Sequence, residues 1–365
     1  MRWIGLVPGL ALLLFTATSV VALLLIPRAT ANRLSTWVAR AVQNTFNLLT
    51  ARVHDYERRD RIRAAGPPTF LIAVLTVWLS FTVLGWGLFI WPFTTESFAS
   101  ALRLAGSAVF TLGFDVPARA VPTAIVFPAA ASGLVIIALQ IAYLPSLYAA
   151  FNRRETLVTL LETEAGSPAW GPEILARYQL IKSTGQLARL YDQWTEWAAD
   201  LSESHTSYRT LVYFRSPEPM RSWLIGLLAV LDAAALHLAI CPQSVPAEAR
   251  LLMRMGYLTL RKIAAAAGIT VNDDPQPSDP ILLTRQEFDD AVAHVVDAGW
   301  LPERDLDEAW KHFHGWRVNY ETAAYGLAYH LDVVPALWSG PRRDTTTGWT
   351  PRRPVDRLPV TADED

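Results

Sequence analysis

The stretch of this chain best suited to chemistry is Thr111-Leu112-Gly113-Phe114-Asp115, which lies between two strongly apolar segments. A cation that crosses a membrane must exchange its water for other oxygens, and the backbone carbonyls of a loop can supply them in rings when several subunits converge. Gly113 favours such a loop because a residue without a Cβ can turn its carbonyl inward at angles closed to other residues. Thr111 adds a hydroxyl oxygen at the inner end. These residue types and their order predict a cation-conducting pore loop.

The same run resembles the Thr-Val-Gly-Tyr-Gly-Asp selectivity filter of potassium channels. Thr111, Leu112, Gly113 and Phe114 match the first four filter positions, whereas the second glycine is absent and Asp115 follows the aromatic residue directly. Upstream, residues 97–102 resemble the start of the family's pore helix. The resemblance covers about residues 70–150. It implies an ion-conduction filter at Thr111 to Asp115, a monovalent cation, namely potassium, as the permeating species, a homotetramer, and no cofactor.

Two apolar segments flank the loop. Residues 70–91 carry no charge, and residues 120–150 contain Gln140 as their one strongly polar side chain before Arg153 and Arg154 follow. At about 1.5 Å per residue, each segment is long enough to cross the roughly 30 Å hydrocarbon core of a membrane. By the positive-inside rule these arginines are cytoplasmic, which places the loop at the outer face. The sequence therefore predicts a pore unit over residues 69–153.

Two further residues of this unit bear on conduction. Gly133 lies in the middle of the second apolar segment, and because the inner helices of potassium channels often hinge at a glycine, it is a candidate gating hinge. The alternative is that Gly133 only lets another helix approach closely. Arg103 is an unusual charge for a pore helix, and we expect it to reach the outer mouth or to pair with Glu96.

The N-terminal residues 1–27 contain a third apolar segment, which we expect to form an uncleaved transmembrane helix. A cleaved signal peptide is the alternative, but its apolar part is usually only about 7 to 15 residues long. Residues 28–68 form a connector with many more arginines than acids, which predicts a cytoplasmic location. An apolar stripe at helical spacing should place part of this connector on the membrane surface or along the bundle, the alternative being a solvated helix. The stripe consists of Leu34, Val38, Val42, Phe46 and Leu49.

After Arg154 the composition changes, and charges at helical spacing predict a cytoplasmic α-helical domain over residues 154–338. Its expected helices span residues 172–203, 217–240, 247–267, 285–300 and 302–331. Thr284 and Glu287 match a capping box. Residues 223–240 are apolar enough to cross a membrane, but Asp232 and His237 lie inside, which favours a buried helix of a soluble bundle. Residues 339–365 are rich in Pro, Arg, Thr and Asp and are predicted to be disordered.

The sequence offers little else that could carry chemistry. His312 and His314 are two residues apart, and helical metal ligands prefer a spacing of three or four, so no metal site is predicted. Asp232 and His237 are five apart and do not share a helix face, which argues against a catalytic pair. Phosphate-binding, dinucleotide-binding and hydrolase motifs are absent, so we expect no enzyme. The single cysteine, Cys241, excludes an intrachain disulfide, and the net charge of −2 gives no indication of a nucleic-acid partner.

These observations predict an all-α membrane protein with a pore-loop, channel-like transmembrane unit and a cytoplasmic α-helical domain. Its three transmembrane helices would lie in a bacterial inner membrane, since arginine far outnumbers lysine, as in proteins from GC-rich genomes. The leading hypothesis is a tetrameric cation channel gated by its cytoplasmic domain, which would take an unidentified ligand or protein partner. One alternative is a non-conducting scaffold or signalling protein that uses the fold to oligomerise. Another is an ordinary three-helix membrane anchor.

Overall fold

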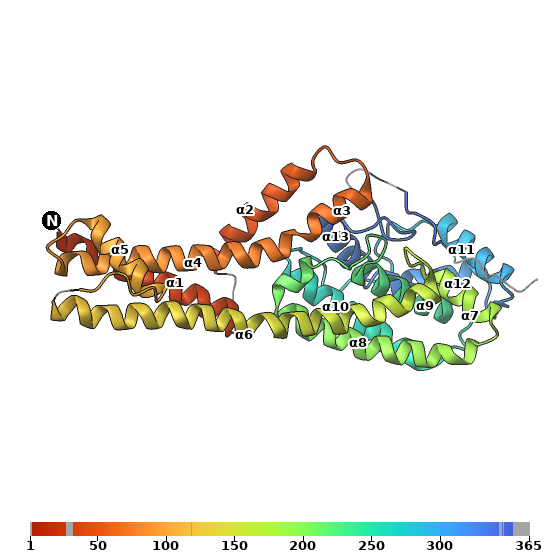
Figure 1. Cartoon of the computed structure of the whole chain (residues 1–365). Helices are drawn as coiled ribbons and strands as arrows, with labels where there is room; N and C mark the ends of the chain where they lie inside the picture. Colours follow the sequence, from red (N-terminus) through yellow and green to blue (C-terminus); the bar gives the residue numbers. More distant parts are fainter. Residues whose placement is uncertain (1, 27–31, 118, 343–344, 346, 353–365) are drawn as a thin grey trace, which may run out of the picture. The chain divides into compact units, whose positions relative to one another are not determined.

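The computed structural model describes residues 2–26, 32–117, 119–342, 345 and 347–352, and every regular element among them is a helix. The chain forms two compact units, which are labelled by their helices in Figure 1. The first unit consists of Met1–Val53 and Ile62–Ala150, and the second of His54–Arg61 and Phe151–Asp365. The predicted connector, residues 28–68, is therefore shared between the two units. The all-helical class predicted from the sequence is confirmed for the described residues.

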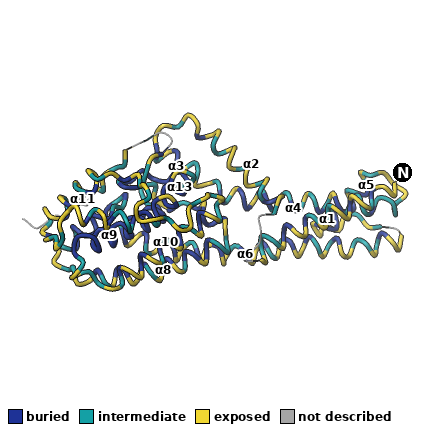
Figure 2. Tube along the Cα trace, turned by 180° about the vertical axis from the view of Figure 1, so that it is seen from behind, coloured by how far each residue is buried: buried dark blue, intermediate teal, exposed yellow. Residues whose placement is uncertain are grey.

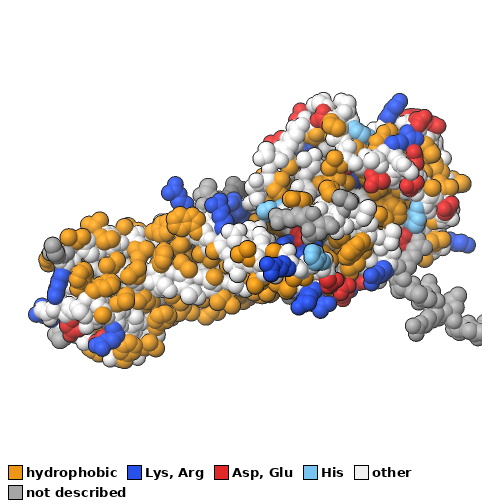
Figure 3. Space-filling view, turned by 90° about the horizontal axis from the view of Figure 1, so that it is seen from above, with side chains coloured by type: hydrophobic (Ala, Val, Ile, Leu, Met, Phe, Trp, Pro, Cys, Tyr) orange, Lys and Arg blue, Asp and Glu red, His pale blue; other side chains and the backbone are white. Residues whose placement is uncertain are grey.

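The first unit holds the apolar helices that flank the loop. On the face drawn in Figure 3, its surface is mostly hydrophobic. Its elements are η1 (Arg2–Gly5), α1 (Leu6–Leu24), α2 (Arg33–Thr50), α4 (Gly66–Ile90), η2 (Trp91–Phe93), α5 (Phe98–Val109) and the first part of α6 (Ala120–Ala165). α3 (Tyr56–Ala64) is divided between the two units. Four helical stretches of the described chain are long and apolar enough to cross a membrane, namely Arg2–Leu24, Tyr56–Phe93, Ala120–Ala165 and Trp223–Ile240.

Glycines bring α1 and α4 into close contact. A Cβ atom on Gly9 would lie 2.9 Å from the carbonyl oxygen of Gly85, and one on Gly5, at the end of η1, would lie 2.8 Å from that of Leu88. Small residues four apart allow this approach, and the van der Waals contact it creates drives helix association in lipid, where the hydrophobic effect is absent. α1 is therefore an integral part of the helix packing of the first unit.

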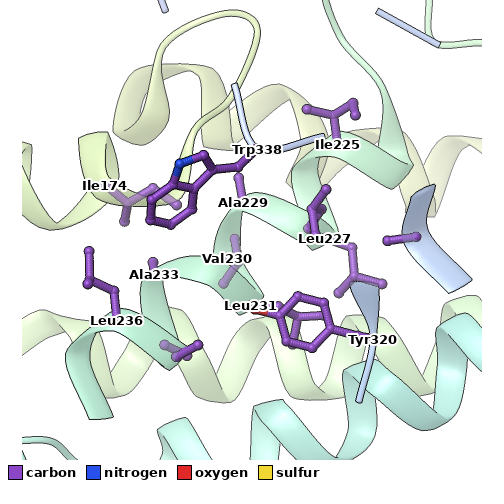
Figure 4. Close-up of a cluster of buried hydrophobic side chains, with 14 of the residues drawn as sticks. Ile174, Ile225, Leu227, Ala229, Val230, Leu231, Ala233, Leu236, Tyr320 and Trp338 are labelled. Carbon is purple, nitrogen blue, oxygen red and sulfur yellow. The ribbon is translucent and has the colours of Figure 1, made fainter. Parts of the chain in front are cut away.

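The second unit is built around α9 (Trp223–Ile240), all of whose residues are buried, as the dark blue helix in Figure 2 shows. Its apolar side chains, among them Val230 and Leu231, meet residues of other elements such as Ile174 and Tyr320 (Figure 4). The other helices of this unit are α7 (Gly171–Leu180), α8 (Leu187–Ser207), α10 (Glu248–Ala266), α11 (Arg285–Asp297), α12 (Leu306–Arg317) and α13 (Glu321–Leu331), with η3 (Thr184–Gln186) and η4 (Arg209–Tyr213). Protein encloses α9 on every side, as expected of a buried bundle helix.

The polar residues of α9 have partners on other elements of the second unit. Asp232 forms an ion pair with the fully buried Arg317 and accepts a hydrogen bond from the Tyr320 hydroxyl at 2.7 Å. His237 is hydrogen-bonded through Nδ1 to the hydroxyl of Tyr191 at 3.1 Å. A buried charge of this kind is tolerated only when it is paired and hydrogen-bonded. The guanidinium of Arg317 also lies over the aromatic rings of Phe313, Tyr320, Tyr325 and Trp338.

Several helix boundaries differ from the predictions. The helix expected over residues 172–203 is broken, because Lys182 adopts a left-handed backbone (φ 53°) between α7 and α8. The helix expected over residues 302–331 begins only at Leu306, where Asp305 caps α12, and it is interrupted between Arg317 and Glu321. The helix expected from residue 217 starts at Trp223. The capping box of Thr284 and Glu287 at the start of α11 is confirmed.

The described part of the tail is ordered against the second unit, unlike the disorder predicted for residues 339–365. Arg342 is buried and donates to the carbonyl oxygens of Val333 and Val334 at 2.8 and 3.1 Å. Trp349 packs edge-on against Tyr56, with 5.6 Å between the ring centroids. These contacts supply the burial that composition alone does not reveal. Residues 353–365 lie outside the described part of the chain.

The segment His54–Arg61 is held in the second unit by buried ion pairs. Arg59 pairs with Asp332 at 3.0 Å, and only 6% of either side chain is exposed. Asp60 pairs with Arg215, whose guanidinium also donates to the carbonyl oxygen of Asp332 at 3.2 Å. Because removing one partner of a buried pair strands the other charge, these contacts fix the segment.

We predict that the burial of His205 lowers the stability of the second unit as the pH falls below about 6.5. His205 is buried beside Trp223, and its Nε2 lies 3.2 Å from Nη1 of Arg154, while its Nδ1 is hydrogen-bonded to Ser204. Burial and the positive charge of Arg154 hold the pKa of His205 well below 6.5. Only the unfolded chain then takes up the proton, so this residue should lower the free energy of unfolding by about 1.4 kcal/mol per pH unit below 6.5.

Chemical unfolding of the detergent-solubilised protein between pH 7.5 and 5.5 measures this effect. His205→Gln should remove the contribution of His205 from the slope, while that of His237, whose pKa burial lowers to about 4, should remain. His312→Gln, at an exposed position, should leave the slope unchanged. An equal slope in wild type and His205→Gln would contradict the prediction.

Candidate functional site

The loop of residues 111–115 is positioned by α5, which lies between α4 and α6. Ser97 caps α5 by accepting a hydrogen bond from the Ser100 amide. A Cβ on Gly87 of α4 would lie 3.0 Å from the Leu102 side chain, and further along α5 Gly106 faces Val83. The residue numbers of the contacting positions therefore decrease along α4 as they increase along α5, so the two helices run antiparallel.

The contacts between α5 and α6 show that these two helices run parallel. Leu104 and Ala105 pack against Ile125 and Val126, whereas the last residue of α5, Val109, meets Gly133. Gly133 is 13 residues beyond the start of α6 at Ala120, which corresponds to roughly 20 Å along the helix. The chain must cover this distance in the opposite direction between the two helices. α5 and the following loop thus form a re-entrant hairpin.

Gly133 determines how closely α5 approaches α6. A Cβ atom at this position would lie 2.0 Å from the carbonyl oxygen of Val109 and 2.8 Å from its carbonyl carbon. No real Cβ occupies such a position without moving the backbone. Gly133 therefore has a packing role, which is the alternative that the sequence analysis gave to a gating hinge. The hinge role of Gly133 stays a prediction.

The loop has an unusual backbone. Thr111 has φ 52° and Gly113 has φ 68°, so two of three successive residues are left-handed. This region is open to glycine but costs energy for a β-branched residue such as threonine, and backbone strain of this kind gathers at functional sites. No atom of another residue lies within 4 Å of a Cβ built on Gly113. The loop is therefore held in a specific conformation while one side of it stays open.

The hydrogen bonds of the loop leave its carbonyls available. The amides of Thr111 and Leu112 donate back to the carbonyl oxygens of Ala108 and Ser107 at the end of α5, at 2.9 and 2.8 Å. Within the described residues, no donor reaches the carbonyl oxygens of residues 111–114. Leu112 and Phe114 are also exposed, at 63% and 61%. Such a loop can present oxygens to a dehydrated cation if other chains complete the ring.

Asp115 fastens the outer end of the loop to α5. Its carboxylate pairs with Nε of Arg103 at 3.0 Å, and its backbone amide donates to the Ser107 hydroxyl at 3.2 Å. The sequence predicted that Arg103 would reach the outer mouth or pair with Glu96, and it did not identify Asp115 as the partner. The signal that could have shown it is the pair of opposite charges on either side of the loop.

The other residues considered from the sequence lie apart from this site. His312 approaches Glu308 at 3.6 Å, and Nδ1 of His314 lies 2.9 Å from the carbonyl oxygen of Pro277. Within the described ranges, no group of three or more His, Cys, Asp or Glu side chains is arranged to hold a metal ion. Cys241 is buried.

In comparisons with known proteins, no protein-family model, curated protein or solved structure matches this chain.

We predict that Gly133→Ala destabilises the first unit by about 1–3 kcal/mol, because the added methyl group would overlap the Val109 carbonyl and force α5 away from α6. Thermal unfolding in a mild detergent measures the change. Gly185→Ala is the matched control, since a Cβ there would meet no atom within 4 Å. Equal melting temperatures for the two variants would refute the packing role of Gly133.

Proposed function

We propose that this protein is a channel-like cation-conducting membrane protein in which the re-entrant loops of four chains line a central pore. The long apolar helices support the membrane assignment. The observation that carries the conduction proposal is the hairpin: α5 runs along α6 as far as Gly133, and the loop returns with free carbonyls at residues 111–114. The filter resemblance makes potassium the expected ion.

The proposal requires several copies, because one loop supplies only one side of an oxygen ring. Closed rings of identical chains are the common symmetric solution. The exposed side chains of Leu112 and Phe114, which no other part of the described chain covers, are the surface that neighbouring copies would cover. Phe127, Leu134 and Ile141 on α6 are likewise exposed and apolar, which suits contact with lipid or with a neighbouring copy.

A non-conducting scaffold is the second candidate, and the pair of Arg103 and Asp115 favours it. Arg103 places a positive charge near the loop and occupies the one carboxylate there, which weakens the attraction for a cation. The absence of the second filter glycine also favours a non-conducting protein. In this alternative the re-entrant hairpin serves assembly, and the second unit carries the activity through a ligand or partner protein.

We also propose that the second unit gates the pore. α6 is one uninterrupted helix, Ala120–Ala165, that begins after the loop and ends in the second unit. α4 follows closely on His54–Arg61, the segment that the ion pair between Arg59 and Asp332 holds in the second unit. The chain thus connects both helices that flank the loop to the second unit, and a rearrangement of that unit can act on both.

Proteoliposomes that contain the full chain should take up potassium, and Gly113→Ala should lower the rate at least tenfold, because alanine disfavours φ 68° and the loop carbonyls would reorient. Gly185→Ala serves as the control for a glycine substitution with no steric effect. Comparison of potassium with sodium uptake gives the selectivity. Wild-type protein that is shown to be multimeric but passes neither ion would refute conduction and favour the scaffold.

Breaking the pair of Arg59 and Asp332 should change the ion flux if the second unit gates the pore. We expect Arg59→Gln and Asp332→Asn to shift the open probability severalfold in the same direction, because each releases the same segment. Asparagine tolerates the left-handed backbone at position 332, where φ is 49°. Arg61→Gln removes an exposed pair with Glu57 from the same helix and is the control. Flux that all three variants leave unchanged would exclude coupling through this segment.

A further inference from the structure

α2 has one face packed within the first unit. Leu34 and Ser35 are buried, and the Ser35 hydroxyl is hydrogen-bonded to that of Ser19 in α1, with 3.2 Å between the oxygens. The same Ser19 oxygen accepts a hydrogen bond from the indole nitrogen of Trp78 in α4 at 3.0 Å. The beginning of α2 is therefore anchored to two of the helices that are apolar enough to cross a membrane.

The other face of α2 is exposed and has a regular composition. Arg33, Trp37, Arg40, Asn44 and Leu48 follow one another at intervals of three or four, which places them on one side of the helix. All five are exposed, with 61% of Trp37 and 78% of Leu48 accessible. We call these five residues the outer stripe. A binding partner of the outer stripe must suit both the exposed ring of Trp37 and the guanidinium groups of Arg33 and Arg40.

α2 itself carries no negative charge, and the acids that come next in the chain, Asp55 and Glu57, belong to the second unit. The chain has no Asp or Glu before Asp55, and the first unit has only Glu96 and Asp115, which lie beyond α4 and next to the loop. Arg33 and Arg40 form no ion pair with any described residue, and neither does the exposed Arg52 just after α2. Three guanidinium groups thus remain available for an external anion.

We propose that the outer stripe, together with Arg52, binds the headgroups of anionic phospholipids. Tryptophan is enriched at the membrane–water interface, where its ring lies among the headgroups. Arginine binds phosphate in a bidentate manner, and basic amphipathic helices lie in this interface. α2 follows the apolar helix α1 after eight residues and packs on α1 and α4. A membrane that holds these two helices would therefore bring anionic lipid headgroups close to α2. The proposal rests on membrane insertion of the first unit and not on ion conduction.

The test is lipid binding to the full chain in a mild detergent, measured by native mass spectrometry as phosphatidylglycerol or phosphatidylcholine is added. Wild type should prefer phosphatidylglycerol. Each arginine removed should lower that affinity about fivefold, so the triple variant Arg33→Gln, Arg40→Gln, Arg52→Gln should lose roughly a hundredfold. Raising the salt from 0.1 to 1 M should reduce the preference, since charge interactions are then screened within about 3 Å.

A matched variant removes three exposed positive charges from the second unit instead, Arg250→Gln, Arg254→Gln, Lys262→Gln, and should keep the wild-type preference. Equal losses in the two triple variants, or equal affinities of wild type for both lipids, would overturn the proposal. A second copy is the competing occupant of the stripe. Trp37→Cys tests it, because Cys241 is buried and gives little background: disulfide-linked dimers protected from a soluble maleimide would show that another copy covers the stripe, whereas open labelling in detergent supports lipid.

Discussion

The approach of the Val109 carbonyl to Gly133 is the contact on which the arrangement of the first unit depends. A single methyl group at Gly133 would overlap that oxygen, so the depth that α5 reaches along α6 is set by the absence of a side chain. The position of Val109 then determines where the loop starts and how far it must return to Ala120. The loop that starts there has a left-handed backbone at Thr111 and Gly113 and ends in the ion pair of Asp115 with Arg103.

The second unit depends on a different constraint, which is that a charge buried in its core must be paired. α9 is as apolar as a transmembrane helix, and composition alone does not separate the two cases. Asp232 distinguishes the buried bundle helix from a transmembrane helix, because its carboxylate is paired with Arg317, which is itself buried among aromatic rings. Replacing Arg317 would leave the buried carboxylates of Asp232 and Glu321 without a positive partner, which is far more costly than losing a surface pair. The apolar surface of α9 is thus covered by protein, whereas that of α1, α4 and α6 leaves large side chains exposed.

The sequence was informative where the determining contacts are local and uninformative where they are distant. Apolar length predicted the helices around the loop, and the Thr284 capping box correctly located the start of α11. The pair of Arg59 and Asp332 joins residues far apart in the chain, so no local pattern shows that residues 54–61 belong to the second unit. Arg342 orders a segment whose composition is typical of disorder, because backbone carbonyls satisfy its guanidinium. Arg103 could be located on α5, but its partner depends on how the loop returns.

The charges of the first unit bear on how a cation could be selected. It contains two carboxylates, Glu96 before α5 and Asp115 in the loop, and Asp115 is already paired with Arg103. Arg2 adds a positive charge just beyond the end of α4, where it donates to the carbonyl oxygen of Thr94. Net negative charge is therefore scarce around the loop, and attraction for a cation would have to come from carbonyl dipoles. The electric field that these carbonyls exert on a cation depends on the backbone angles of the loop. The strained conformation of Thr111 would then matter more for selectivity than any acidic side chain.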